Sequence, residues 1–186
     1  MVEGPFIVGI GGSTSPTSVT NRLLARCLAH VGELGARTDA IFGAELAELP
    51  IFTMDATLEP TGERLLAAVR AADAVIIASP GYHGGMSGLV KNAVDHLELL
   101  RDDERPYLDG RAVGVIVSAA GWQACGTTLV SVRSTIHALR GWPTPFGVTV
   151  NSAEPVAGPD GFEPGVDGAL RILAGQLVEF TSWTVR

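Results

Sequence analysis

The sequence predicts a doubly wound α/β fold, a three-layer α/β/α sandwich around a five-stranded parallel sheet, with residues 1–186 in one domain. Three observations support this prediction. Short apolar runs alternate with segments whose apolar residues recur at helical spacing, as in parallel sheets that helices cover on both faces. The length of 186 residues suits one domain with a full core. The chain shows no internal repeat and no linker, so a second domain is not expected.

Five apolar runs predict the strands. Most of them carry branched apolar side chains and few charges, which is typical of buried strands. The second run contains Arg37 and Asp39 and is therefore expected at the outside of the sheet. Ser79 and Pro80 are expected to end the third strand. In chain order, the predicted strands are 6–10, 36–42, 74–78, 112–117 and 145–150.

Helical spacing of apolar residues predicts five helices, each with one apolar face that would pack on the sheet. The first helix begins near Thr20, and Gly32 and Gly35 end it. The segments 43–60 and 151–165 are polar or rich in proline and glycine, and they are expected to be loops. In chain order, the predicted helices cover about 20–31, 63–72, 88–101, 127–139 and 166–180.

Composition excludes several classes of function. The formal net charge is -7 and there is no basic run, so nucleic acid and anionic membranes are not expected as partners. No stretch approaches the roughly 20 apolar residues that a membrane helix needs. The N-terminus has no basic region before a long apolar run, so a cytoplasmic location is expected. Cys27 and Cys125 lie far apart in different motifs, which argues against a disulfide framework and a zinc site, and no metal is expected.

The loop after the first predicted strand, residues 11–21, carries six hydroxyl side chains within eight residues and leads into a helix. In parallel sheets, ligands bind at the carboxyl ends of the strands. A helix N-terminus offers free N–H groups and a positive dipole end, which favour phosphate. A helix cap needs only one hydroxyl, so the excess indicates a phosphorylated cofactor. A Walker A loop is excluded because lysine is missing, and Thr14 stands where the third glycine of a dinucleotide fingerprint would be.

The loop after the third predicted strand, residues 79–88, contains four glycines. Glycine lets the backbone approach a flat ligand closely, so amides of this loop could bond the edge of a ring system while Tyr82 or Met86 packs against it. His83 could act as a general acid or simply hold the loop together. Lys91 and Asn92, in the first turn of the next helix, could orient the loop or make a subunit contact.

The loop after the fourth predicted strand, residues 118–126, is again small and rich in glycine, so it could line the same cleft. Trp122 could stack on a planar ligand, act as a lid or anchor an interface. Cys125 has no base partner nearby in sequence, so a nucleophilic role is not expected. No side chain is assigned to catalysis.

These three loops resemble the NAD(P)H-dependent FMN reductase family, which has a flavodoxin-like fold. The most specific similarity is the motif Pro80-x-Tyr82-His83-Gly84 followed by Gly-Leu-Val-Lys-Asn-Ala-Val-Asp at 88–95. Gly12-Ser13 with residues 18–21, and the segment 118–126, complete the resemblance. It implies the strand order 2-1-3-4-5. It assigns cofactor binding to Ser13, Ser15, Ser18, Val19, Thr20, Asn21, Pro80, Gly81, Tyr82, His83, Gly84, Gly85, Ser118 and Gly121.

The resemblance implies a non-covalent FMN with its phosphate in the first loop and its ring edge along residues 82–85. The third loop would flank the flavin and help to admit the nicotinamide of NAD(P)H. Relatives form homodimers or homotetramers through the helix that begins near Gly88. Many members carry arginine at the position of Ser15 and an acidic residue at the position of Gly81, so this chain departs from the family at both.

Three functions follow as hypotheses from this resemblance. A flavin reductase would pass a hydride from NAD(P)H to FMN, with the protein supplying position and electrostatics, and could deliver reduced FMN to a flavin-dependent monooxygenase. The same flavoprotein could instead reduce a quinone, azo compound or metal oxyanion directly. A non-enzymatic electron carrier like a flavodoxin is the alternative from another class, and a flavodoxin-like domain that has lost its cofactor is a fourth possibility.

Overall fold

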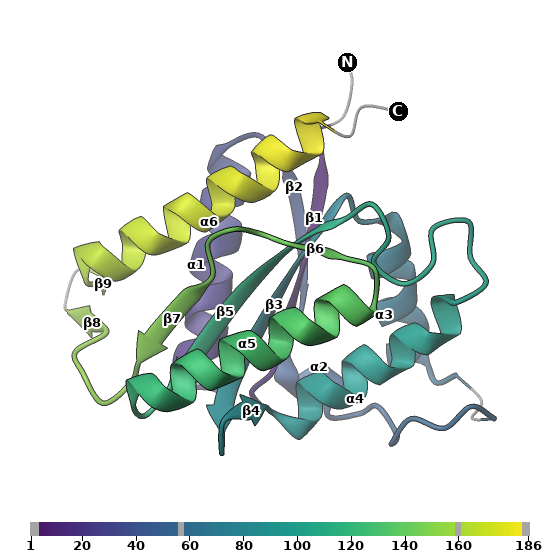
Figure 1. Cartoon of the computed structure of the whole chain (residues 1–186), viewed down its shortest axis with the longest axis horizontal. Coiled ribbons are helices and arrows are strands. Elements are labelled where there is room, and N and C mark those ends of the chain that lie inside the picture. Colours follow the sequence, from purple (N-terminus) through teal and green to yellow (C-terminus); the bar gives the residue numbers. More distant parts are fainter. Residues whose placement is uncertain (1–3, 56–57, 159–160, 184–186) are drawn as a thin grey trace.

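A mostly parallel sheet forms the middle layer of the protein, whose computed structural model describes residues 4–55, 58–158 and 161–183 (Figure 1). The strand order is β2-β1-β3-β5, and β6 and β7 both pair with β5. This is the 2-1-3-4-5 order of flavodoxin-like folds, with two short strands in the fifth position. The strands are β1 (Phe6–Gly11), β2 (Arg37–Ile41), β3 (Ala74–Tyr82), β5 (Ala112–Ala119), β6 (Trp142–Pro143) and β7 (Val148–Asn151).

The division of the fifth strand differs from the prediction of one strand over 145–150. β6 pairs with the beginning of β5 and β7 pairs with its end, both in parallel. The chain leaves the sheet between the two strands, where the Phe146 N–H donates to the Gln176 side chain at 3.0 Å instead of to β5. The Thr144 N–H still donates to the Val113 carbonyl at 3.0 Å, which keeps the segment close to β5.

Helices cover both faces of the sheet, as predicted (Figure 1). The apolar side chains of α1 and α6 form one buried cluster with the sheet, and those of α3, α4 and α5 form a second cluster on the opposite face. Neighbouring residues of β1 divide between the two, since Ile7 belongs to the first cluster and Val8 to the second. The helices are α1 (Val19–Glu33), α3 (Pro60–Ala71), α4 (Gly88–His96), α5 (Trp122–Ala138) and α6 (Pro164–Trp183).

Several boundaries differ from the sequence-based prediction. The predicted helix 88–101 ends at His96 as an α-helix and continues as a 3₁₀ turn, η1 (Leu97–Leu100). The predicted loop 43–60 contains the one-turn helix α2 (Gly43–Leu46), whose Leu46 is fully buried.

The predicted loop 151–165 contains a small antiparallel pair, β8 (Ala157–Gly158) and β9 (Gly161–Phe162). Short elements of this kind carry too few residues to show a period in the sequence.

The prediction that Ser79 and Pro80 end the third strand was wrong, because β3 continues to Tyr82. Backbone polar groups alternate in direction along a strand, so those of Ala78 and Pro80 point to the same side. The Ala78 carbonyl accepts from the Gly12 N–H at 2.9 Å, where β1 ends. The nitrogen of Pro80 therefore points past the end of β1, where no ladder bond is lost.

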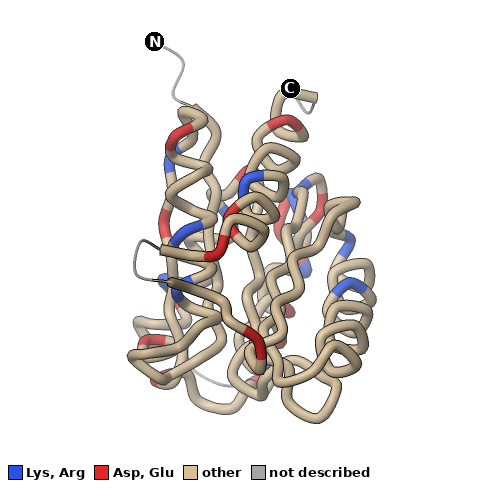
Figure 2. The backbone as a smooth tube through the Cα atoms, turned by 90° about the vertical axis from the view of Figure 1, so that its left-hand side faces the viewer, with Lys and Arg blue, Asp and Glu red and all other residues tan. Residues whose placement is uncertain are grey.

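Acidic and basic residues lie interspersed along the helices in Figure 2, without a stretch of one sign. A group of ion pairs centred on Asp167 joins α1 to α6. The Asp167 carboxylate accepts from Arg26 Nε at 2.7 Å, from His30 Nε2 at 2.9 Å and from Arg171 Nε at 3.2 Å. The Arg26 guanidinium, assisted by His30 and Arg171, holds the pKa of Asp167 well below its usual range. Among the described residues, no helix is both long and apolar enough to span a bilayer.

Candidate functional site

Three loops meet at the carboxyl ends of β1, β3 and β5. The Gly12 N–H bonds the Ala78 carbonyl, so the first loop starts beside β3. Pro80 of β3 pairs with Ser118 of β5, which brings the second and third loops together. The structure therefore places the three segments that the sequence singled out next to one another, in the order expected for a parallel sheet.

The first loop holds its shape through its own polar groups. Ser18 is the N-cap of α1, and its Oγ accepts from the Asn21 N–H at 3.3 Å. The Asn21 Nδ2 donates to the Ser13 carbonyl at 2.7 Å, while the Ser13 Oγ accepts from the Ser15 N–H at 3.3 Å. Thr20 is buried, whereas Ser15 is exposed. Part of the excess of hydroxyls is thus explained by loop structure.

The N-terminus of α1 nevertheless keeps unsatisfied donors. Within the described part of the chain, the backbone N–H groups of Val19 and Thr20 have no acceptor, as expected for the first turn of a helix. The Asn21 Oδ1 is buried and likewise has no partner among the described residues. Arg22 does not reach back to the loop, because its guanidinium lies 5.2 Å from the centre of the Phe162 ring. Free N–H groups at a positive helix end fit a phosphorylated ligand that is held by neutral donors.

Close backbone approaches fix the loop in place, and sequence reasoning missed the residues responsible. A Cβ on Gly43 would collide with the Ser13 backbone, so the start of α2 supports the first loop only because it is glycine. Ser87, the buried N-cap of α4, donates from Oγ to the Gly12 carbonyl at 3.0 Å. Its N–H donates to the Ser79 Oγ at 2.9 Å. The position of Ser87 just before a helical apolar pattern could have indicated its capping role.

The second loop is a β-hairpin, in which Gly81 and Tyr82 of β3 pair with β4 (Gly85–Met86). The two turn residues, His83 and Gly84, have φ values of 52° and 82°. Two positive φ values are typical of a two-residue hairpin turn that matches the twist of the strands. Tyr82 and His83 are both exposed, so the hairpin presents a polar tip above the sheet.

Packing explains the departure from the family at position 81. A Cβ on Gly81 would lie 2.8 Å from the Thr128 Oγ1 and 2.9 Å from the Ala119 Cβ. These distances are shorter than real Cβ contacts, so β5 and α5 leave no room for an acidic side chain without a shift. The hairpin can therefore pack closely against α5.

The third segment is a strand end and a helix start instead of a long loop. Ser118 lies within β5 and is buried, and Gly121 is the N-cap of α5 with φ 120°. The Gly121 N–H donates to the Asn151 Oδ1 at 2.8 Å, and the Trp122 indole N–H donates to the Glu154 carboxylate at 2.8 Å. The sequence placed the start of this helix near residue 127 because the small residues before it carry no helical apolar pattern.

A cavity of about 600 Å³ lies between the hairpin and the first turns of α5. Of the predicted site residues, His83, Gly84 and Gly121 line it, whereas the first loop does not. The cavity has small walls and an open mouth, which suits a flat molecule that enters from solvent. Its remaining lining residues, which the sequence analysis did not single out individually, are Ala120, Gln123, Ala124 and Thr127.

The two cysteines take no part in this site. Cys125 is buried, its thiol faces the Val150 carbonyl at 3.4 Å, and burial raises the pKa of the Cys125 thiol. Burial also raises the pKa of Cys27 to about 12. Neither cysteine lines the cavity, and the raised pKa of each favours the protonated thiol over the nucleophilic thiolate.

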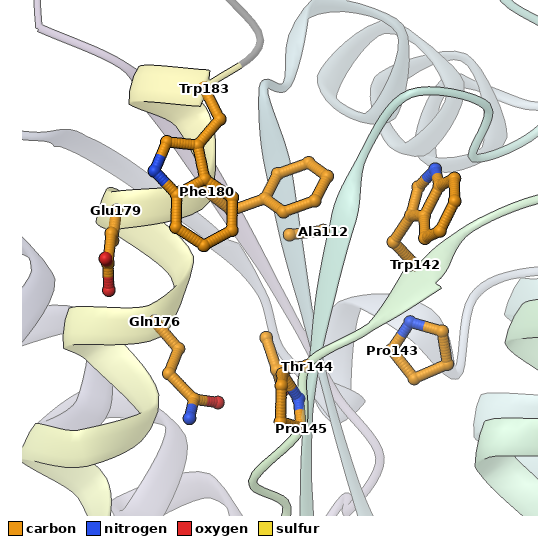
Figure 3. Close-up of a pocket in the computed structure, with 9 residues that line it drawn as sticks. All are labelled: Ala112, Trp142, Pro143, Thr144, Pro145, Gln176, Glu179, Phe180 and Trp183. Atoms are coloured by element: carbon orange, nitrogen blue, oxygen red, sulfur yellow. The ribbon is translucent and has the colours of Figure 1, made fainter.

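A more apolar cavity of about 300 Å³ lies at the opposite end of the sheet (Figure 3). Trp142 lies on one side of it, and Phe180 and Trp183 of α6 lie on the other (Figure 3). Ala112 and Trp142, the first residues of β5 and β6, mark it as the amino-terminal end of the strands. Because ligands of doubly wound sheets bind at the carboxyl ends, the three loops are the candidate site and this cavity is not.

Comparison with known proteins identifies the family. Residues 5–154 match the family described as NADPH-dependent FMN reductase. An FMN-dependent NADPH-azoreductase of Staphylococcus aureus is 27% identical over 168 residues, which are 86% of this chain and 82% of that protein. An NAD(P)H-dependent FMN reductase of Pseudomonas aeruginosa is 27% identical over 133 residues, 70% of this chain and 68% of that protein.

The fold comparison agrees. The structure of an oxidoreductase from Corynebacterium diphtheriae superposes with a TM-score of 0.79 at 19% identity, covering 98% of this chain and 100% of that one. The sequence-based identification of the family is confirmed, and the family match favours a reductase over an electron carrier. The chain belongs to the NADPH-dependent FMN reductase family, oxidoreductases that work with FMN and NAD(P)H.

Proposed function

We propose that this protein binds FMN with its phosphate at the N-terminus of α1. The observation that carries this proposal is the pair of free N–H groups of Val19 and Thr20 at the positive end of that helix. The hydroxyls of Ser13, Ser15 and Ser18 lie in the same loop and can add neutral hydrogen bonds. The cofactor residues predicted from the sequence stay a prediction until FMN binding is measured.

The hairpin tip and the start of α5 complete the proposed site. The flavin edge would face the backbone of residues 82–85, whose N–H groups can stabilise negative charge on a reduced ring. The cavity between the hairpin and α5 would receive the nicotinamide or the second substrate. When bound, FMN supplies the redox chemistry by accepting a hydride from NAD(P)H and passing electrons on. The protein's part is to orient both rings, and no side chain acid or base is required.

The lack of charged side chains in the first loop supports a reductase that binds and releases its flavin. Residues 12–21 contain no lysine or arginine, and Arg22 is turned toward Phe162. Neutral donors lack the ionic attraction that lysine or arginine adds to a hydrogen bond with phosphate. We therefore expect FMN to dissociate readily, so that reduced FMN could reach a flavin-dependent monooxygenase. An open cavity beside the hairpin also supports the second candidate, direct reduction of a quinone, azo compound or metal oxyanion, and the azoreductase of Staphylococcus aureus agrees with it.

Two measurements test these proposals. Titration of the apoprotein with FMN, followed by quenching of flavin fluorescence, gives the affinity, and we expect a micromolar dissociation constant. Steady-state oxidation of NADPH and of NADH is then measured with free FMN and with p-benzoquinone as acceptors. Turnover with free FMN supports the exchanging reductase. If only the quinone sustains turnover, direct reduction is the function. If bound flavin is not reduced by either nucleotide, the protein is a carrier and both proposals are wrong.

We further propose that the protein forms a homodimer or homotetramer through α4. A cavity of about 260 Å³ between α4 and α5 is lined by charged and apolar residues, among them Phe52, Lys91 and Val94. Ile51 and Met54, in the segment that crosses α4, are 80% and 55% exposed. Light scattering after size-exclusion chromatography tests the assembly, and Ile51→Glu, at the more exposed of these two positions, should dissociate it. A cytoplasmic location is likewise proposed, and cell fractionation tests it.

A further inference from the structure

The N-terminal turn of α5 carries a hydrogen-bond network that lies outside the cavity. The Asn151 Oδ1 accepts from the N–H groups of Gly121 at 2.8 Å and Ala153 at 3.1 Å. The Asn151 Nδ2 donates to the Glu154 Oε1 at 2.8 Å, and the same oxygen accepts from the Trp122 indole at 2.8 Å. The loop after β7 is therefore tied to α5 at two points, by Asn151 to the backbone and by Glu154 to the tryptophan.

This network sets the side of α5 on which the indole lies. The sheet order is β3, β5, β7, so the hairpin of β3 and the Glu154 loop after β7 lie on opposite sides of β5. Gly121 and Gln123 line the cavity on the hairpin side, yet Trp122 between them does not. Its indole is held on the β7 side instead.

In the part of the chain that the structure describes, the indole N–H has the Glu154 carboxylate as its hydrogen-bond partner. The Trp122 side chain is 56% exposed, so packing contributes only part of its position. A χ1 angle has three staggered wells, and leaving the present one breaks the hydrogen bond to Glu154. On the cavity side, Ala120 and Ala124 are small and leave the mouth open. The carboxylate is thus the group that decides between an indole beside β7 and an indole over the cavity.

We propose that Glu154 is a positioning residue that holds Trp122 away from the cavity, and that this pair determines how large an electron acceptor the site admits. The inference rests on the proposed use of the cavity by the second substrate. A released indole would cover part of the mouth and compete with a bulky aromatic acceptor, whereas a small quinone would still enter. The pair therefore controls acceptor size and leaves reduction of the flavin unchanged.

The test compares a small acceptor, p-benzoquinone, with a bulky one, the azo dye methyl red. Glu154→Ala and Trp122→Phe both abolish the hydrogen bond and keep an aromatic ring, and each should raise the KM for methyl red by up to about fivefold, the factor by which losing one such bond shifts the equilibrium between the two indole positions. Glu154→Gln keeps the acceptor oxygen and should behave like the wild type. The KM for p-benzoquinone and its kcat should stay unchanged in all three variants.

A double variant separates this role from a structural one. If Glu154 acts by restraining the indole, Trp122→Ala should cancel the effect of Glu154→Ala, and the double variant should reduce methyl red like the wild type. A KM that stays raised in the double variant would mean that Glu154 acts through Asn151 on the fold, which overturns the proposal. An unchanged KM in both Glu154→Ala and Trp122→Phe overturns it as well.

A measurement without FMN tests the restraint on Trp122 independently of the proposed function. In a Trp142→Phe/Trp183→Phe background, emission comes from Trp122 alone, because the chain has three tryptophans. Adding Glu154→Ala should lower the fluorescence anisotropy of Trp122 in the apoprotein and increase its quenching by acrylamide. Equal anisotropy and quenching with and without Glu154 would show that the carboxylate does not restrain the indole. If this optical change occurs but no acceptor is reduced, the proposed function fails while the restraint stands.

Discussion

Replacing Ser18 by alanine separates the capping role that the structure shows for its hydroxyl from the phosphate contact proposed for it. In the free protein, the Ser18 Oγ caps α1 by accepting from the Asn21 N–H, and the bond is long, at 3.3 Å. Loss of an N-cap costs about 0.5–2 kcal/mol, and a long bond on a partly buried residue belongs near the lower end, at about 0.5–1 kcal/mol. If the hydroxyl also donates to the FMN phosphate, binding should weaken as well. Combining Ser13→Ala with Ser18→Ala should lower the binding free energy by about 1–3 kcal/mol, because the lost bonds involve a charged group.

Two assays distinguish these effects. Urea denaturation of the apoprotein measures how much the cap contributes to folding stability. Titration with FMN measures binding to protein that is already folded, and the cap makes no direct contribution to this binding. Ser134→Ala, at an exposed position of α5, is the matched control and should change neither quantity. An FMN affinity that is unchanged in the double variant, with the expected loss of stability, would show that the phosphate binds elsewhere. The reasoning from the free N–H groups of Val19 and Thr20 would then be wrong.

Three further predictions concern the walls of the site and the α1–α6 contact. Gly81→Ala should lower the free energy of unfolding in urea by about 1–3 kcal/mol, because the added Cβ collides with Thr128 and Ala119. Thr128→Ala in the same chain should recover part of this loss. If the effects of the two substitutions simply add, the clash is not the cause. Gly121→Ala should lower the free energy of unfolding by about 1–3 kcal/mol through backbone strain alone, because the added Cβ meets nothing within 4 Å. The control Gly126→Ala, inside the helix, should leave stability unchanged or raise it. Asp167 has a depressed folded-state pKa, so its stabilisation is present above its unfolded pKa of about 3.9 and is lost as the pH falls through the folded value. Asp167→Asn should therefore lower the free energy of unfolding at pH 7 by about 1 kcal/mol, a value kept small because Arg26 is partly exposed to solvent. The difference in stability between variant and wild type should shrink below about pH 4. A difference that does not change with pH would contradict this reasoning.

The fold could be predicted because its main elements carry a period. Branched runs such as 74–78 and 112–117 fixed the buried strands, and the apolar faces of the long helices fixed the layers. The errors lie where local chemistry decides. Pro80 does not end the third strand, because its nitrogen points past the end of β1 and the sheet loses no hydrogen bond there. The interruption between β6 and β7 arises elsewhere, because the Phe146 N–H donates to the Gln176 side chain of α6 instead of to β5. Both outcomes depend on neighbouring elements, which a single sequence does not show.

The site was predicted in outline for a related reason. Ligand loops follow strands, so the carboxyl ends of β1, β3 and β5 could be found from the strands alone. Tertiary contacts decided the rest. Gly43 supports the first loop across 30 residues of sequence, and Asn151 and Glu154 reach the start of α5 from the loop after β7. Contacts of this kind produce no periodic pattern in the sequence. Ser87 differs, because its place directly before a helix indicates a capping role in the sequence itself.

The residue at position 15 of the first loop bears on whether FMN is released or stays bound during turnover. In a site built from backbone N–H groups, affinity depends on how well the loop is held in place, and here Asn21 and Gly43 hold it through the Ser13 backbone. A guanidinium at position 15 would add a charge-assisted bond without altering that frame, since Ser15 is exposed and its hydroxyl forms a hydrogen bond with the Thr17 hydroxyl two residues on. Ser15→Arg should therefore tighten FMN binding by about 1–2 kcal/mol, and it should lower turnover with free FMN if release of the flavin limits the reaction. Tighter binding with undiminished FMN turnover would show that the flavin stays bound and that electrons leave through the cavity beside the hairpin. Unchanged affinity would show that position 15 does not face the phosphate.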